Sequence, residues 1–196
     1  MAPFDIELAW LAGIIDGEGC FSVKRGRGAG RSHQLWLVLC NTSEAMILRV
    51  VRILDALGVK HSNVRKVWKG EKATRWQFWL DVTRKHDLLR ATEAVLPHLT
   101  AKKTEAEIAA WFLRRACAVN QYRASQLDRV MLDSMSAIKR NGGEAPADIA
   151  ELIREVIPSQ AVAGDRQADD QAAEGVETRS VSPTNNPTHE CPASLN

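Results

Sequence analysis

The spacing of apolar and polar residues predicts a chain of alternating helices and β-hairpins. Apolar positions three and four residues apart indicate helices, whereas strict alternation indicates a strand with one buried face. The helices are expected from residue 5 onward and over 44–57, 87–95 and 103–118, and the strands at 20–25, 33–41, 63–68 and 74–82. This order predicts an α+β domain, αββαββα, with an antiparallel four-stranded sheet.

The last expected strand shows that one face of this sheet lies outside the core. In the stretch TRWQFWLDV, the apolar residues Trp76, Phe78 and Leu80 alternate with side chains that must point the other way. The outward positions include further tryptophans, Trp36 and Trp79. They either serve a binding surface or are covered by the C-terminal part of the chain.

The pattern changes after the fourth expected helix, which ends near residue 118. Two further helical patterns, near residues 124–139 and 146–157, form a C-terminal helical extension. From Pro158 onward, large apolar residues are almost absent, which is typical of a disordered tail. We therefore divide the chain into a core domain (1–118), a helical extension (119–157) and an acidic tail (158–196).

Charge is distributed unevenly along the 196 residues. Residues 1–140 carry 23 Lys and Arg against 14 Asp and Glu, whereas residues 141–196 carry 3 against 10. The net charge of +2 conceals this contrast. A basic body with an acidic tail indicates a polyanionic partner for the body.

The cysteine spacing and the hydropathy of the chain indicate the cellular compartment in which the protein works. The four cysteines have no paired Cys-x-x-Cys spacing, which argues against a zinc site or a disulfide framework and favours a reducing compartment. No apolar run approaches the length of a membrane span, and the N-terminus lacks a secretory signal, so no membrane partner is expected. We expect a cytoplasmic protein, encoded by a bacterium or a phage, with an organelle as the alternative.

The first helix combines small residues with two carboxylates. Ala9, Ala12, Gly13 and Gly17 form a stripe of small side chains beside the apolar one. A glycine inside a helix lowers the stability of the helix by about 1 kcal/mol relative to alanine. Close approach of another backbone would explain why a glycine stands at position 13. The alternative is that this stripe packs against the protein's own sheet.

The stretch LAGIIDGEG, at residues 11–19, resembles the motif of the LAGLIDADG homing endonucleases. The resemblance extends to the αββαββα order, to the strand HQLWLVL and to LPHLTAKK at the start of the later helix, and it covers about residues 5–117. It implies that the motif helix packs beside the same helix of a second domain. Since the chain contains one motif only, the active form is expected to be a homodimer that reads a pseudo-palindromic site in double-stranded DNA.

The resemblance also implies a set of active-site residues. Glu18 is the acidic residue delivered to the centre, where it binds Mg²⁺ together with the backbone carbonyl of Gly17, and the metal activates water for cleavage of both strands. Lys102 or its neighbour Lys103 is the lysine that approaches the centre, and we select Lys102. Asp16 is expected to hold the helix ends together. The expected dimer interface consists of Ala9, Ala12, Gly13, Asp16 and Gly17.

The outer face of the sheet and the hairpin ends are the expected DNA-binding surface. Strand residues would read base edges in the major groove, and basic residues in the turns would contact phosphates. The strand positions are Ser22, Lys24, Gln34, Trp36, Val38, Cys40, Arg75, Gln77, Trp79 and Asp81. The basic positions at hairpin ends are Arg25, Arg27, Arg31, Lys66, Lys69 and Lys72.

Three functions fit this sequence. The first is a Mg²⁺-dependent, site-specific double-strand endonuclease, which the presence of Glu18 and Lys102 favours. The second is a maturase that binds intron RNA on the same scaffold. The third is a DNA-binding regulator that has kept the fold and lost cleavage.

Overall fold

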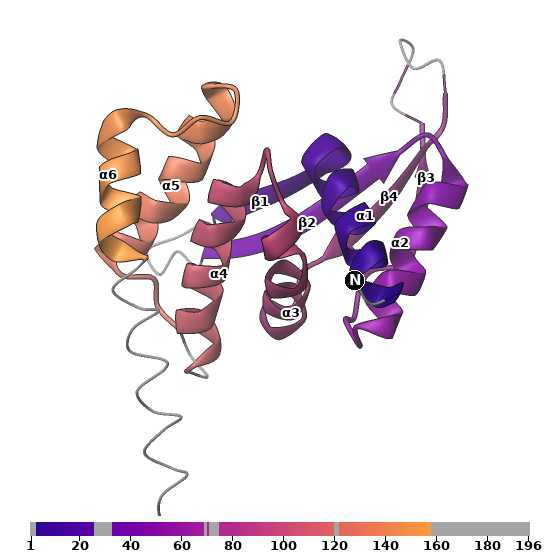
Figure 1. The fold of residues 1–196 in the computed structure, drawn as a ribbon, viewed down its shortest axis with the longest axis horizontal. Coiled ribbons are helices and arrows are strands. Elements are labelled where there is room, and N and C mark those ends of the chain that lie inside the picture. The colour runs from indigo at the N-terminus through magenta and orange to yellow at the C-terminus, as the bar shows by residue number, and fades with distance from the viewer. Residues whose placement is uncertain (1–2, 26–32, 69, 71–74, 120–121, 158–196) are drawn as a thin grey trace, which may run out of the picture. The chain divides into compact units, whose positions relative to one another are not determined.

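Four strands form one antiparallel sheet, and helices cover one of its faces (Figure 1). The computed structural model describes residues 3–25, 33–68, 70, 75–119 and 122–157. The elements of the core are α1 (Pro3–Glu18), β1 (Gly19–Arg25), β2 (His33–Asn41), α2 (Glu44–Ala56), β3 (Arg65–Val67), β4 (Gln77–Val82), α3 (Lys85–Val95), the 3₁₀ turn η1 (Leu96–His98) and α4 (Lys103–Cys117). Two further helices follow, α5 (Gln126–Arg140) and α6 (Ala147–Val156). The predicted α+β fold class is confirmed.

The order of strands in the sheet is β1-β2-β4-β3. Each hairpin pairs its own two strands, and the hairpins join where β2 runs antiparallel to β4, with Leu37 opposite Val82 and Cys40 opposite Trp79. The beginnings of β1 and β4 therefore lie near the end of β2. The chain enters β1 directly from α1, so the end of the motif helix lies at this end of the sheet.

Alternation along the strands separates a core face from an open face. In β2, Leu35, Leu37 and Leu39 are buried, while the residues between them are half-buried or exposed. The buried face packs against α1, α2, α3 and α4, whose own buried residues include Leu11 and Ile15 of α1. The other face carries none of these helices (Figure 1) and remains available for binding.

The ends of several elements differ from the predicted ones. β3 and β4 are shorter than expected because the ladder between them stops at the pair Val67–Gln77. Beyond it, Trp68 and Trp76 remain exposed and pack edge to face, with ring centroids 5.2 Å apart. The helix α1 begins at Pro3, ahead of the predicted cap Asp5, since proline is well suited to the first turn of a helix.

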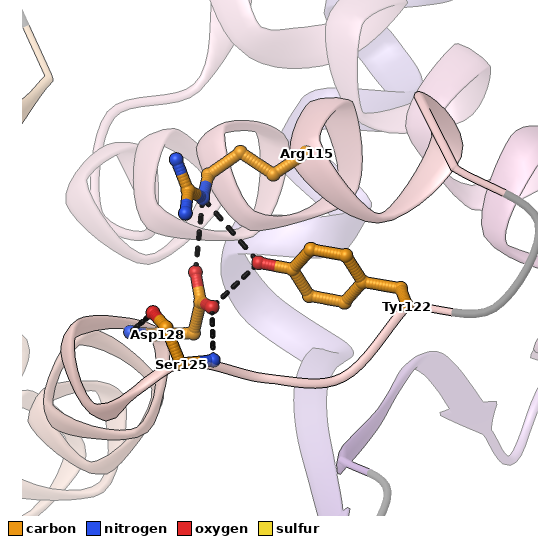
Figure 2. Close-up of polar contacts among 4 residues, drawn as sticks. All are labelled: Arg115, Tyr122, Ser125 and Asp128. Carbon is orange, nitrogen blue, oxygen red and sulfur yellow. Dashed lines mark hydrogen bonds and ion pairs between the residues drawn. The ribbon is translucent and has the colours of Figure 1, made fainter.

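The helical extension is attached to α4 through a polar network around Asp128 (Figure 2). Arg115 of α4 donates to Asp128 Oδ1 at 3.0 Å, and the hydroxyl of Tyr122 donates to Asp128 Oδ2 at 2.5 Å. Ser125 and Asp128 form a reciprocal capping box, with the backbone N–H of each bonded to the side chain of the other. Met131, Leu132 and the other buried residues of α5 then continue the core of residues 5–117.

These contacts set the ionisation of Asp128. Burial acts to raise its pKa, but the hydrogen bonds from Tyr122 and Ser125 and the charge of Arg115 outweigh burial and hold the pKa below its usual value. A lowered folded-state pKa means that the network contributes stability above the pKa of the unfolded chain. That contribution is lost as the pH falls through the folded-state pKa.

The predicted disordered tail, residues 158–196, lies outside the described residues. Within the described part of the chain, no helix is long and apolar enough to cross a membrane.

Replacing Tyr122 with phenylalanine should destabilise the extension. The change removes the hydroxyl that donates to the buried Asp128 carboxylate and accepts from Arg115 at 3.3 Å, so we expect a loss of about 1–3 kcal/mol in the free energy of unfolding. Urea denaturation at neutral pH, followed by circular dichroism, measures this loss.

An exposed ion pair between α3 and α4 provides the matched control. Arg114 and Glu93 lie 2.7 Å apart but are 54% and 41% exposed, so Glu93→Gln should cost at most about 1 kcal/mol. Equal losses for the two variants would contradict the anchoring role of Tyr122.

Candidate functional site

The end of α1 passes into β1 without a connecting loop, and a glycine makes this junction possible. A Cβ atom on Gly19 would lie 2.8 Å from both the Cα and the carbonyl oxygen of Ile15, closer than such atoms approach. Only glycine fits there without a shift of the backbone. The residue before it, Glu18, is exposed at the last position of α1, and within the described residues it has no hydrogen bond or ion pair.

The other carboxylate of the motif is fully engaged inside its own chain. Asp16 Oδ2 accepts from the backbone N–H of Thr100, and Oδ1 accepts from that of Lys102, both at 2.8 Å. Asp16 therefore caps the start of α4 with its carboxylate. The sequence placed Asp16 in the dimer interface, but the role visible in the structure is this contact between α1 and α4.

Lys102 in turn binds the C-terminal end of α1 with its side chain. Its Nζ donates to the carbonyl oxygen of Ile15 at 2.9 Å and also to that of Asp16. The last carbonyls of a helix lack partners and carry partial negative charge, so an ammonium group is stabilised there. Lys103, the alternative, is an exposed residue that opens α4. Of the two lysines, Lys102 is the one held against the end of the motif helix.

The face of α1 with small residues is partly buried and partly open. Gly13 and Gly17 are exposed, and a Cβ added to either would meet nothing within 4 Å. Ala9 is half-buried. Ala12 is completely buried in the core, so its predicted place in a dimer interface is wrong. Position 12 lies on the flank of α1 that packs into the core.

The open face of the sheet contains a groove of about 460 Å³. It is lined by Ser22, Lys24, Trp36, Val38, Arg65, Val67, Trp79 and Asp81. Six of these residues were predicted from strand alternation, and Gln34, Cys40 and Gln77 lie at alternate positions on the same face.

Two polar contacts prearrange side chains in this groove. Lys24 Nζ lies 3.2 Å from the centroid of the Trp36 ring, a cation–π contact that keeps the ammonium group over β2. Arg65 is bonded to the carboxylate of Asp81, whose side chain is 10% exposed, whereas that of Arg65 is 54% exposed. The partner of Asp81 is thus in its own sheet, and the groove exposes the guanidinium group.

Arg65 was missed because β3 is only three residues long. Three residues are too few to show alternation in the sequence, and the contact depends on the pairing of Arg65 with Trp79 across the hairpin. The register of β3 also places Lys66 within the strand, although the sequence had placed it at a hairpin end. Lys66 is opposite Phe78 and lies on the core-facing side, where its Nζ is 5.0 Å from the ring centroid of Trp76.

The remaining predicted binding residues have other positions. Arg75 is exposed but precedes β4, so it is a hairpin residue and its predicted strand position is wrong. Arg25 ends β1. Four of the predicted basic residues lie outside the described residues: Arg27, Arg31, Lys69 and Lys72.

Comparison with known proteins agrees with this geometry. Residues 5–96 match the family model described as a LAGLIDADG-like domain. No curated protein sequence matches the chain.

Several solved structures resemble the chain. The homing endonuclease I-TnaI is 18% identical with a TM-score of 0.50, and the match covers 75% of this chain and 93% of that one. The archaeal intron-encoded homing endonuclease I-Vdi141I, solved in complex with DNA, is 12% identical with a TM-score of 0.50 and coverages of 81% and 98%. The homing endonuclease I-CvuI, solved with a DNA target, is 20% identical with a TM-score of 0.49 and coverages of 80% and 95%.

At these identities the solved structures support the fold, and the match over residues 5–96 supports the family. The motif helix, the four-stranded sheet with its open face and the family match lead to one conclusion: residues 5–96 of this chain form a LAGLIDADG-like domain.

Proposed function

We propose that this chain is a site-specific DNA endonuclease that cuts both strands of its target as a homodimer. The observation that carries the proposal is the exposed Glu18 at the end of α1, which has no hydrogen bond or ion pair with the other described residues. It follows by two residues the Asp16 carbonyl that binds the Lys102 ammonium group, and it leads directly into β1 of the sheet. An exposed carboxylate without a partner adds little to folding. It is well placed to bind a cation at the surface where DNA would lie.

The residues at this end of α1 fit a hard divalent cation such as Mg²⁺. Glu18 offers carboxylate oxygens, and the exposed Gly17 would offer its backbone carbonyl oxygen. Among the described residues, no group of three or more potential metal ligands occurs in one chain. Of the described residues at this end of α1, Glu18 would supply one carboxylate, and a second chain and phosphate oxygens would complete the site.

Each residue of the centre then has a distinct role in cleavage. Glu18 would hold the cation, and the loop-free junction at Gly19 keeps its backbone in place. Lys102, held on the carbonyls of Ile15 and Asp16, would place positive charge beside the phosphate under attack. When bound, the cation lowers the pKa of a water molecule and stabilises the leaving oxygen.

The open strip of α1 supports assembly of two chains. Ile6 is 55% exposed, and Gly13 and Gly17 have no neighbour in their own chain that requires a glycine. A helix that exposes glycines allows the same helix of a second copy to approach closely. A two-fold axis along this strip would bring the two Glu18 residues together.

The open face of the sheet supports DNA as the partner. Lys24 and Arg65 expose cationic groups in the groove, and Gln34 on the same face is exposed. Arginine pairs well with guanine edges and glutamine with adenine edges in the major groove. Intron RNA and a non-cleaving regulatory role remain as outcomes that the tests below distinguish.

Glu18→Gln should abolish cleavage and preserve DNA binding. The substitution keeps the shape of an exposed side chain but replaces the carboxylate by an amide, a poor ligand for Mg²⁺, so the rate should fall below about 1% of wild type. A cleavage assay with Mg²⁺ is compared with a binding assay with Ca²⁺.

Asp16→Asn is the matched control, since it makes the same chemical change two residues away. Its amide cannot accept from both Thr100 and Lys102 as the carboxylate does, so stability should fall before chemistry is affected. If Glu18→Gln cuts DNA at the wild-type rate, the active-site proposal is wrong. Selective binding of intron RNA, or DNA binding without cleavage by the wild type, would indicate a maturase or a regulator.

Gly13→Leu should separate the dimer without unfolding the chain. A Cβ atom at this exposed position meets nothing within 4 Å among the described residues. Leucine favours a helix by roughly 0.8–1 kcal/mol relative to glycine, so the monomer should be at least as stable as wild type. Sedimentation should show monomers, and cleavage should be lost. Glu151→Leu, at an exposed position of α6, is the control and should remain dimeric. A wild type that sediments as a monomer and still cleaves would contradict the dimer proposal.

Arg65→Gln should weaken DNA binding, whereas Lys66→Gln should have little effect. The two variants make the same change in charge at adjacent residues, but Arg65 faces the groove and Lys66 the opposite side of the sheet. Loss of a base-reading arginine costs about 1–3 kcal/mol at one base pair, and loss of a phosphate contact reduces the salt slope by about one. Binding isotherms at several salt concentrations, on the preferred site and on single-base variants, measure both effects. Equal effects of the two variants would exclude this face as the reading surface.

A further inference from the structure

Three charged side chains, two from the start of α4 and one from the end of α5, lie next to the candidate active centre. They are Lys102 at the start of α4, Glu105 in the first turn of α4 and Lys139 in the last turn of α5. Lys139 Nζ lies 3.6 Å from Glu105 Oε2. Both lysines act electrostatically on the carboxylate of Glu105.

Glu105 is the central group of this cluster. It is 3% exposed, and its Oε2 atom accepts no hydrogen bond from the described residues. Burial raises the pKa of Glu105, while the charges of Lys139 and Lys102 oppose that shift. A buried carboxylate is stable only beside positive charge, so Glu105 needs at least one of the two lysines.

Lys139 connects the helical extension to the start of β1. Its Nζ donates to the carbonyl oxygen of Phe21 and to Cys20 Sγ, the latter at 3.3 Å. These residues follow Glu18 by two and three positions. The extension therefore contacts β1, the strand that follows Glu18 directly. The cleavage mechanism proposed above gives this contact no role.

We propose that Lys139 is a positioning residue for Lys102. By neutralising Glu105, Lys139 leaves the Lys102 ammonium group on the carbonyls of Ile15 and Asp16, beside Glu18. The inference rests on the proposed endonuclease function, and it assigns the extension a part in building the active centre.

Glu105 and the carbonyl groups at the end of α1 compete for the ammonium group of Lys102. Without Lys139, the buried Glu105 carboxylate keeps Lys102 as its sole lysine partner in the cluster. Glu105 lies one helical turn from Lys102, whose long side chain can change direction at little cost. Attraction in a low-dielectric environment would then draw the ammonium group away from the end of α1. The positive charge would leave the site of the attacked phosphate.

The test is a double-mutant cycle in the full-length chain. Lys139→Met removes the charge and keeps the length of the side chain, and Glu105→Gln removes the carboxylate that would attract Lys102. Arg140→Met is the control, because it makes the same change in charge at the adjacent exposed residue. Single-turnover cleavage with Mg²⁺ and equilibrium binding with Ca²⁺ are measured for each variant.

Lys139→Met should slow cleavage at least tenfold, with less than a twofold change in DNA affinity. In the Glu105→Gln background, the same substitution should change the rate less than twofold, because no carboxylate remains to attract Lys102. Arg140→Met should behave as wild type. A merely structural role for Lys139 would predict the same loss in both backgrounds, and that result would overturn the proposal.

A stability measurement and a second variant test the Lys139–Glu105 pair without relying on cleavage. Urea unfolding without metal or DNA should show that Lys139→Met shifts the midpoint more in the wild type than in Glu105→Gln, and additive shifts would contradict the pairing. If Lys139→Met does not fold, Lys139→Gln is measured, since its amide still donates a hydrogen bond to Phe21. A wild type that cleaves no DNA would refute the endonuclease proposal, whereas equal cleavage by wild type and the Lys139 variant would refute this inference alone.

Discussion

A reciprocal set of hydrogen bonds between Asp16 and Lys102 holds the two key helix ends together. The carboxylate of Asp16 caps the start of α4, and the ammonium group of Lys102 caps the end of α1. These residues are 86 positions apart in the chain. Each helix end has unsatisfied backbone groups of the opposite sign, so one pair of side chains stabilises both ends at once. The position of Glu18, two residues beyond Asp16, follows from this contact.

This contact explains why the motif contains two carboxylates with different properties. Asp16 has both oxygens bonded to backbone N–H groups, so it stabilises the fold and has little capacity left for a cation. Glu18 follows at the open end of the helix, where Gly17 is exposed and Gly19 allows an immediate turn into the sheet. The glycines of the motif therefore serve different purposes. Gly19 avoids a clash within the chain, whereas Gly13 and Gly17 leave a stripe of α1 that the other described residues do not cover.

Local patterns in the sequence predicted the order of elements and the face of most strand residues, because alternation and helical spacing are local properties. They failed for Ala12, since a small residue beside an exposed glycine can point to the core or to a partner, and only the packing of α1 decides. Arg65 was missed because its strand is too short to show a pattern. The contact of Lys139 with Glu105 joins helices whose relative placement depends on tertiary packing, so no local signal in the sequence could indicate it.

The helix α5 is fixed by charged groups at both of its ends. At its first turn, Asp128 accepts from Arg115 of α4, and at its last turn Lys139 is bonded to β1 and paired with Glu105. Apolar contacts allow a helix to slide or rotate by small amounts, whereas a charged contact to a buried carboxylate near each end restricts that movement. The pair Lys139–Glu105 therefore depends on the network around Asp128, although the two contacts lie at opposite ends of α5. Through this dependence, the attachment of the extension influences the groups that surround Glu18.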